Sequence, residues 1–191
     1  MSPARRKRSD RGGGAGKLHA VVLAGGAGER FWPASRQRRP KPFLKVQGGE
    51  SLLAATLARA RRFASLDCVW VVCGADHARL LRAETGLPAG RVLVEPHRRN
   101  TAMAVGFAAE RIRAEDRDGV LAVLPADHHI PDAAAFARAI RRAARAAREA
   151  EVLVTLGVKP SRPDTGYGYI QPGARVGKAF AGLHRVQRFV E

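Results

Sequence analysis

The stretch from Val21 to Leu44 holds the residue types best suited to chemistry. An apolar run at 19–24 leads directly into closely spaced glycines, which are followed by cations. Glycines let backbone N–H groups approach a ligand with no Cβ in the way, and an arginine guanidinium can form bidentate hydrogen bonds with phosphate oxygens. The stretch therefore predicts a polyphosphate site, although the glycines alone would equally fit a tight turn after a buried strand. The residues that would meet the phosphates are Gly25, Gly26, Gly28, Arg30 and Lys41.

Two common phosphate-binding patterns do not describe this turn. The P-loop needs Gly-Lys-Ser/Thr after its glycines, and no such sequence follows here. The dinucleotide fingerprint fits only in part, because Phe31 stands where the third glycine belongs and Pro33 interrupts the expected helix. The glycine spacing by itself leaves the kind of phosphate site open.

A lone carboxylate, Asp127, follows the apolar run at 120–124 and precedes two histidines. Such a carboxylate suits a hard cation, above all Mg²⁺, which takes few protein ligands and uses phosphates for the rest. Zinc fits less well, because adjacent histidines rarely aim at one metal and no third nitrogen or sulfur ligand lies nearby. His128 is better explained as a hydrogen-bonding residue that holds the loop.

Two further segments carry candidate ligand contacts, and each has a purely structural alternative. Glu95 follows the third apolar run, and Asn100 or Thr101 just after it would serve equally as the cap of the next helix. Residues 165–170 place two glycines among tyrosines. Glycines there would let a sugar ring approach the backbone, or would simply form a tight hairpin.

The loops at Gly25, Glu95, Pro125 and Lys159 lie just after predicted strands. Apolar runs predict strands at 19–24, 68–73, 91–94, 120–124 and 152–158. Capping residues and helical periodicity predict helices at 51–64, 76–85, 101–113 and 132–150. This alternation predicts an α/β fold, a Rossmann-like three-layer sandwich on a mostly parallel central sheet. Sites in such sheets gather at the carboxyl ends of the strands, where the candidates are expected.

Composition narrows the classes of partner. The 191 residues suit one domain, and the net charge of +17 would suit a nucleic-acid-binding protein. Aromatic residues make up only 6% and do not alternate with basic ones, so we expect no specific nucleic-acid partner. The five arginines at helical spacing within 132–150 are better explained as a solvated helix face than as a polyanion site.

The amino-terminal residues 1–17 combine a basic cluster with consecutive glycines, which predicts a disordered tail before a domain at 18–191. No apolar segment follows the basic cluster as in a signal peptide. No apolar stretch approaches the ~18 residues of a membrane span. We therefore expect a cytoplasmic protein without membrane contact.

Five motifs together resemble the signature of the sugar-1-phosphate nucleotidyltransferases. The first two are Leu23-Ala24-Gly25-Gly26-x-Gly28-x-Arg30-Phe31-Trp32-Pro33 with Pro40-Lys41-x-Phe43-Leu44, and Glu-Pro-x-x-Arg-Asn-Thr-Ala at 95–102. The others are Pro-Ala-Asp-His at 125–128, Thr-Gly-Tyr-Gly-Tyr-Ile at 165–170, and Phe-Val-Glu at 189–191. Within that family the chain most resembles the bacterial mannose-1-phosphate guanylyltransferases.

The resemblance implies the nucleotide-diphospho-sugar transferase fold and a Mg²⁺-dependent reaction. GTP and mannose 1-phosphate would give GDP-mannose and diphosphate. It implies catalytic roles for Arg30, Lys41 and Asp127, with Asp127 as the metal ligand. It implies nucleotide contacts for Leu23, Ala24, Gly25, Gly26, Gly28, Glu95, Arg99, Asn100, Thr101, Pro125 and Ala126. It implies sugar contacts for Gly166, Tyr167, Gly168, Tyr169 and Glu191.

The chain also departs from the family pattern. Pro42 stands where the family often has glutamine, beside the proposed role of Lys41. The lysine expected after Glu191 and a second metal-binding aspartate are absent, so we expect a domain that is incomplete at its carboxyl end. Two alternatives therefore stay open: a sugar-1-phosphate nucleotidyltransferase with another base or sugar, and a truncated nucleotide-binding fragment without activity. A homo-oligomer is also left open.

Overall fold

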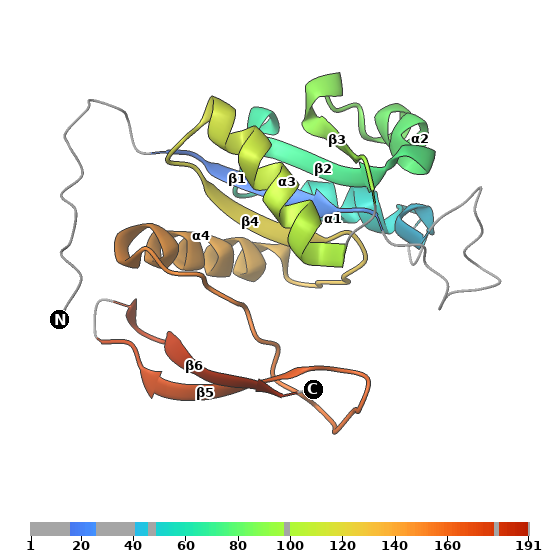
Figure 1. Cartoon of the computed structure of the whole chain (residues 1–191). Helices are drawn as coiled ribbons and strands as arrows, with labels where there is room; N and C mark the ends of the chain where they lie inside the picture. The colour runs from blue at the N-terminus through green and yellow to red at the C-terminus, as the bar shows by residue number, and fades with distance from the viewer. Residues whose placement is uncertain (1–15, 26–40, 46–48, 98–99, 178–179, 191) are drawn as a thin grey trace. The chain divides into compact units, whose positions relative to one another are not determined.

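The computed structural model describes residues 16–25, 41–45, 49–97, 100–177 and 180–190, which fall into two compact units, 1–141 and 142–191. The first unit contains a four-stranded parallel sheet in the order β3-β2-β1-β4 (Figure 1). Its strands are β1 (Leu18–Leu23), β2 (Val69–Gly74), β3 (Val92–Glu95) and β4 (Val120–Pro125). The predicted α/β architecture on a parallel sheet is confirmed, because all four strands run in one direction.

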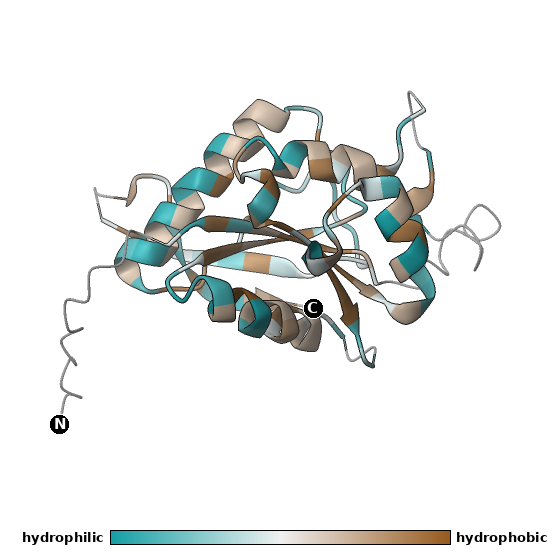
Figure 2. Ribbon diagram, turned by 90° about the horizontal axis from the view of Figure 1, so that it is seen from above, coloured by the Kyte–Doolittle hydropathy of each residue, from teal (hydrophilic) through white to brown (hydrophobic). Residues whose placement is uncertain are grey.

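Helices cover both faces of this sheet. They are α1 (Leu52–Ala60), α2 (Ala75–Thr85), α3 (Asn100–Glu115) and α4 (Ala133–Ala150), with short 3₁₀ turns η2 (Lys41–Phe43), η3 (Leu66–Cys68) and η4 (Ala89–Arg91). Successive strand residues point to opposite faces, so Val22 packs in the cluster that contains α1, α2 and Ile140 of α4. Val21 and Trp70 pack on the other face against α3, which Figure 1 shows crossing the sheet. Figure 2 shows the apolar strands between these two layers.

Local signals in the sequence explain where the helices begin and end. The Ser51 hydroxyl accepts a hydrogen bond from the Ala54 amide at 3.1 Å and so caps α1. Asp132 caps α4 in the same way, at 2.8 Å from the Ala135 amide. Gly86 ends α2 with φ +61°, a left-handed conformation that glycine adopts without a Cβ clash. No helix among the described residues is long and apolar enough to cross a membrane.

The second unit contains an antiparallel pair, β5 (Tyr169–Arg175) and β6 (His184–Val190). The strand predicted at 152–158 is wrong, since these residues carry no regular secondary structure. A strand needs a neighbouring edge for its backbone hydrogen bonds, and no ladder joins this segment to either described sheet. The prediction rested on an apolar run. Such a run indicates that a segment is suited to burial, but it does not show that another strand is available to pair with it.

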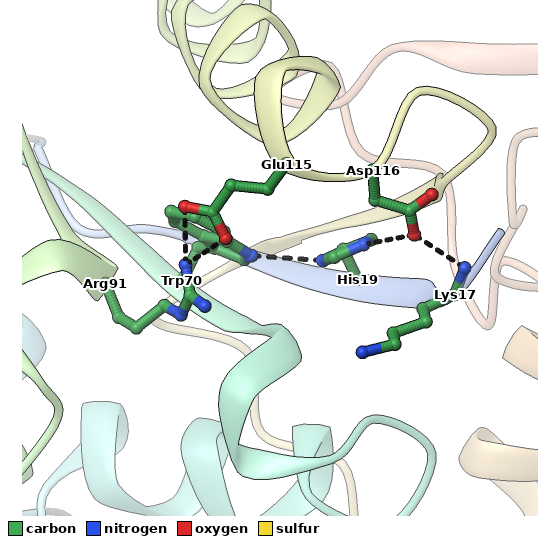
Figure 3. A network of polar contacts seen from close by, with 6 residues as sticks. All are labelled: Lys17, His19, Trp70, Arg91, Glu115 and Asp116. Atoms are coloured by element: carbon green, nitrogen blue, oxygen red, sulfur yellow. Dashed lines mark hydrogen bonds and ion pairs between the residues drawn. The ribbon is translucent and has the colours of Figure 1, made fainter.

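A polar network ties the amino-terminal ends of the strands together (Figure 3). The Trp70 indole N–H donates to His19 Nδ1 at 3.1 Å, and because indole is only a donor, Nε2 carries the proton of a neutral His19 ring. His19 Nε2 then donates to Asp116 Oδ2 at 3.0 Å, and the Lys17 amide donates to the same oxygen at 2.7 Å. Burial raises the pKa of Asp116, but these hydrogen bonds outweigh burial and leave that pKa below its ordinary value.

The same end of the sheet bears a cavity of about 350 Å³, lined by residues of the network. Arg91 lies 4.1 Å above the Trp70 ring and binds both carboxylate oxygens of Glu115 at 2.8 and 3.0 Å. The polar groups of this lining are thus largely paired with one another. The carboxyl ends of the strands, at the opposite edge of the sheet, carry the candidate site.

Candidate functional site

The end of β1 leads directly into the glycine-rich turn. The Ala24 amide donates to the Val72 carbonyl at 2.8 Å, and the Ala126 amide donates to the Leu23 carbonyl at 3.1 Å. Leu23 and Ala24 are therefore held between β2 and the loop after β4. The turn continues into Gly26, Gly28 and Arg30, which lie outside the described residues.

Gly25 is the first glycine of the turn and lies against Glu95. A Cβ built on Gly25 would lie 3.1 Å from Glu95 Oε2, so glycine is what lets the carboxylate approach the backbone here. Glu95 ends β3, and its register partner on β2 is Gly74, which has no side chain to separate Glu95 from β1. The structure thus brings two predicted nucleotide contacts together across three strands.

Lys41 and Asp127 form an ion pair. Lys41 begins the 3₁₀ turn η2, Asp127 follows β4, and Nζ lies 2.5 Å from Oδ2. Their side chains keep 23% and 32% of their surface exposed, so both groups remain open to a ligand. Two of the three predicted catalytic residues therefore share one place at the carboxyl edge of the sheet.

The segment after β3 leads into α3. Asn100 has φ +62°, in the left-handed region that asparagine tolerates better than most residues. Asn100 and Thr101 are exposed at the start of the helix, while Arg99 lies outside the described residues. Pro125, the last residue of β4, is exposed, and Ala126 after it is buried.

The sequence did not single out Thr56 and Arg59 of α1, which contact the Asp127 loop. The Thr56 hydroxyl lies 3.2 Å from the Ala126 carbonyl, and Arg59 Nη2 donates to the His128 carbonyl at 2.7 Å. Helical periodicity places Thr56 on the apolar face of its helix, and an arginine at the next turn normally faces solvent. The three-residue spacing of Thr56 and Arg59, which places both side chains on one side of α1, was the one available signal. It becomes informative only once the Asp127 loop is seen to pack against that side of the helix.

In the second unit, residues 164–169 form a turn built around Asp164 and Tyr169. The Asp164 amide donates to the Tyr169 hydroxyl at 2.8 Å, that hydroxyl donates to the Asp164 carbonyl at 2.9 Å, and the Gly166 amide donates to Asp164 Oδ1 at 3.0 Å. Tyr167 is 68% exposed. The ring of Tyr169 thus fixes the turn, while Tyr167 is presented to solvent. Glu191 lies outside the described residues.

The donor chemistry of the first unit suits a hard divalent cation. Among the described residues, no group of three or more His, Cys, Asp or Glu side chains is placed to hold a metal. Asp127 is an accessible carboxylate beside a turn expected to carry phosphates. Mg²⁺ binds through one or two carboxylates and takes its other ligands from phosphate and water, so Asp127 fits this mode and a protein-only cage does not.

Comparisons place these motifs among known proteins. A family model described as nucleotidyl transferase matches residues 19–191. The alginate biosynthesis protein AlgA of Pseudomonas aeruginosa is 41% identical over 174 residues, which are 90% of this chain and 36% of AlgA. RfbM of Salmonella typhimurium, named mannose-1-phosphate guanylyltransferase, is 39% identical over 176 residues, again 90% of this chain and 36% of RfbM.

A solved structure also resembles this chain. It comes from Thermus thermophilus and is named mannose-1-phosphate geranyltransferase. It matches with a TM-score of 0.80 at 40% identity, over 92% of this chain and 50% of that one. The chain therefore spans little more than one third of the two curated relatives and half of the solved chain.

Proposed function

The chain belongs to the nucleotidyl transferase family, and we propose that it forms the nucleotide-binding part of a mannose-1-phosphate guanylyltransferase. The reaction would join GTP and mannose 1-phosphate to give GDP-mannose and diphosphate. The observation that carries this proposal is the gathering of Gly25, Glu95, Lys41 and Asp127 at one edge of the sheet. The choice of guanine and mannose is supported by relatives named mannose-1-phosphate guanylyltransferase at 39% identity.

The proposed chemistry needs no general base. The sugar phosphate is already an anion, so one of its oxygens attacks the α-phosphorus of GTP in line while the bond to the diphosphate breaks. The protein must then supply position and charge stabilisation. Lys41 would neutralise the region of the α-phosphate, and Arg30 the departing diphosphate.

The nucleotide would lie along the carboxyl edge of the sheet. The backbone of Gly25, Gly26 and Gly28 would cradle the triphosphate, and Glu95 has the acceptor oxygens that the guanine ring N–H and amino group need. Asp127 would hold Mg²⁺, which when bound neutralises phosphate charge. Lys41 Nζ lies 2.5 Å from Asp127 Oδ2. A cation bound to Asp127 would therefore compete with Lys41 for this carboxylate.

The turn at residues 164–169 would contribute sugar contacts. Gly166 and Gly168 would let the sugar approach the backbone of the turn that Asp164 and Tyr169 hold together. The exposed ring of Tyr167 is available to a ligand, and Glu191 would accept hydrogen bonds from sugar hydroxyls. Cytoplasmic location is part of the same proposal, supported by Cys68 and Cys73, which are buried and not joined in a disulfide, as suits a reducing compartment.

The proposal is tested by a thermal-shift titration of the chain with GTP, ATP, UTP and GDP-mannose, each with and without Mg²⁺. A ligand that binds only the folded state raises the melting temperature in proportion to ln(1 + [L]/Kd). We expect GTP and GDP-mannose to stabilise the chain and ATP and UTP not to. Lys41→Met should weaken the GTP response, whereas Lys45→Met, a matched loss of an exposed lysine nearby, should not.

Turnover distinguishes the alternatives. Diphosphate release from GTP should require mannose 1-phosphate and fail with glucose 1-phosphate. Stabilisation by GTP without any diphosphate release would favour a nucleotide-binding fragment. Stabilisation by another nucleoside triphosphate would favour a related transferase, and a cooperative melt that no nucleotide shifts would refute the proposal.

A further inference from the structure

We infer that Thr56 and Arg59 of α1 are positioning residues that hold the Asp127 loop in the geometry that metal binding requires. This inference rests on the proposed function, because it assigns the two residues a role at the proposed Mg²⁺ site. Neither side chain is proposed to touch the metal or a substrate.

The contacts bracket Asp127 on both sides. The Thr56 hydroxyl lies 2.9 Å from the Leu52 carbonyl and 3.2 Å from the Ala126 carbonyl, and it accepts a hydrogen bond from Arg59 Nη2 at 2.7 Å. Arg59 Nη2 also donates to the His128 carbonyl at 2.7 Å. The carbonyls immediately before and after Asp127 therefore both lie within hydrogen-bond distance of side chains on one helix, and the single hydroxyl hydrogen of Thr56 is shared between the Leu52 and Ala126 carbonyls.

A third contact ties this loop to β1. The Ala126 amide donates to the Leu23 carbonyl at 3.1 Å, two residues before Gly25, the first glycine of the turn. With both neighbours of Asp127 held through their backbones, the direction of the Asp127 Cα–Cβ bond is restrained. The carboxylate itself stays 32% exposed and reaches Lys41, so the loop is fixed while the ligand-binding atoms are left open.

Burial of Arg59 argues that this arrangement serves more than packing. Arg59 is only 7% exposed, and the acceptors described for Nη2 are a hydroxyl and a carbonyl, both neutral. Its Nε is buried without a hydrogen-bond partner among the described residues. Burial lowers the pKa of Arg59, while the Glu50 carboxylate acts in the opposite direction.

A buried charge held by neutral groups is expensive, and an apolar side chain of similar length would fill this position more favourably. What an apolar side chain could not do is donate to the His128 carbonyl. Groups that orient a metal ligand in this way typically change metal affinity 10–100-fold when they are removed. We therefore expect the function of Thr56 and Arg59 to show in metal affinity more than in folding.

The test compares four variants of the full chain: Thr56→Val, Thr56→Ser, Arg59→Met and Arg113→Met. Valine keeps the β-branched shape of threonine but removes its hydroxyl, and serine restores the hydroxyl. Arg113 lies on the exposed side of α3, paired with Glu110, and so controls for the loss of an arginine from a helix. Three quantities are measured: the Kd of Mn²⁺ in the presence of GTP by electron paramagnetic resonance, the Kd of GTP without metal, and amide exchange over 126–129.

We expect Thr56→Val and Arg59→Met to raise the Mn²⁺ Kd at least ~10-fold and to speed amide exchange over 126–129. Metal-free GTP binding should change less than about threefold, on the ground that the glycine turn is untouched. Thr56→Ser and Arg113→Met should resemble the wild type. If Arg59→Met loses its cooperative melt, the comparison of Thr56→Val with Thr56→Ser decides the question.

Three negative results are distinguished. If the wild type binds Mn²⁺ with GTP and Thr56→Val binds it equally well, the positioning role is refuted and the proposed function stands. Equal losses in metal-free and metal-dependent GTP binding would also refute it, because they would show a general structural role. If the wild type binds GTP but no Mn²⁺, the proposed metal site itself fails.

Discussion

Replacing Asp127 by asparagine should affect protein stability only slightly and Mg²⁺-dependent GTP binding strongly, so it distinguishes the structural contribution of this carboxylate from its proposed role in the reaction. The change removes the charge of one carboxylate and leaves its size nearly unchanged. In the ligand-free protein it breaks the 2.5 Å pair with Lys41. Because both side chains are partly exposed, solvent screens this pair, and its loss should destabilise the protein by about 1 kcal/mol or less.

The effect on ligand binding should be much larger. At a GTP concentration 100 times Kd, ligand binding stabilises the wild type by about 2.7 kcal/mol, which for a chain of this size raises the melting temperature by roughly 5–11 °C. If Asp127→Asn weakens Mg²⁺-dependent GTP binding ~100-fold, the same concentration yields only about 0.4 kcal/mol, or a rise of roughly 1–2 °C. Turnover should fall at least ~100-fold, as on loss of one charge-stabilising group.

Differential scanning fluorimetry, run with and without Mg²⁺ and GTP, measures both the intrinsic stability and the Mg²⁺-dependent binding of GTP. Asp132→Asn is the matched control, because it also removes one carboxylate, while asparagine remains a good helix cap. In EDTA, Asp127→Asn should bind GTP at least as well as the wild type, since Lys41 no longer has the carboxylate to hold it. An unchanged Mg²⁺-dependent shift in Asp127→Asn would contradict the assigned role.

Three further predictions follow from single contacts. Gly25→Ala should weaken GTP binding without loss of a cooperative melt, because the new Cβ would meet Glu95 Oε2 at 3.1 Å; wild-type affinity by titration would show that the contact yields freely. Ser51→Ala should destabilise the protein by about 1 kcal/mol through loss of the α1 cap, lowering the melting temperature by roughly 2–4 °C; no shift would mean that the cap is dispensable. Asp116 has a lowered pKa in the fold, so its contribution is present above the ordinary carboxyl pKa and disappears as pH falls through the folded value. The melting advantage of the wild type over Asp116→Asn should therefore shrink below about pH 4, and a difference that stays constant from neutral to acid pH would contradict this account.

Local chemistry in the sequence was enough to predict most of the first unit. Continuous apolar runs predicted the parallel strands, and β1 and β2 at the centre of the sheet are buried because helices cover both of their faces. Ser51, Gly86 and Asp132 marked helix ends through hydrogen bonds and backbone conformations that depend on near neighbours alone. The sharing of one sheet edge by the candidate residues was predictable too, since parallel strands end together.

Pairing at a distance was not predictable in the same way. The run at 152–158 has the composition of a strand, yet no ladder joins it to either described sheet, although β3 and β4 are edge strands of the first one. Apolar composition therefore did not decide whether this segment pairs, because pairing depends on which distant segment meets it.

The sequence by itself determined which residues are candidates for phosphate and metal chemistry: the glycines after β1, Lys41, Glu95 and Asp127. Only the tertiary structure decided how they meet, with Lys41 on Asp127, Glu95 against Gly25, and Arg59 buried beneath the Asp127 loop. The physical reason is that residue type and spacing define the capacity to bind, whereas burial and contact depend on segments far apart in the chain. Arg59 shows the difference most clearly, because an arginine on a helix is solvent-facing by default and becomes a positioning residue only when a distant loop presents a carbonyl to it.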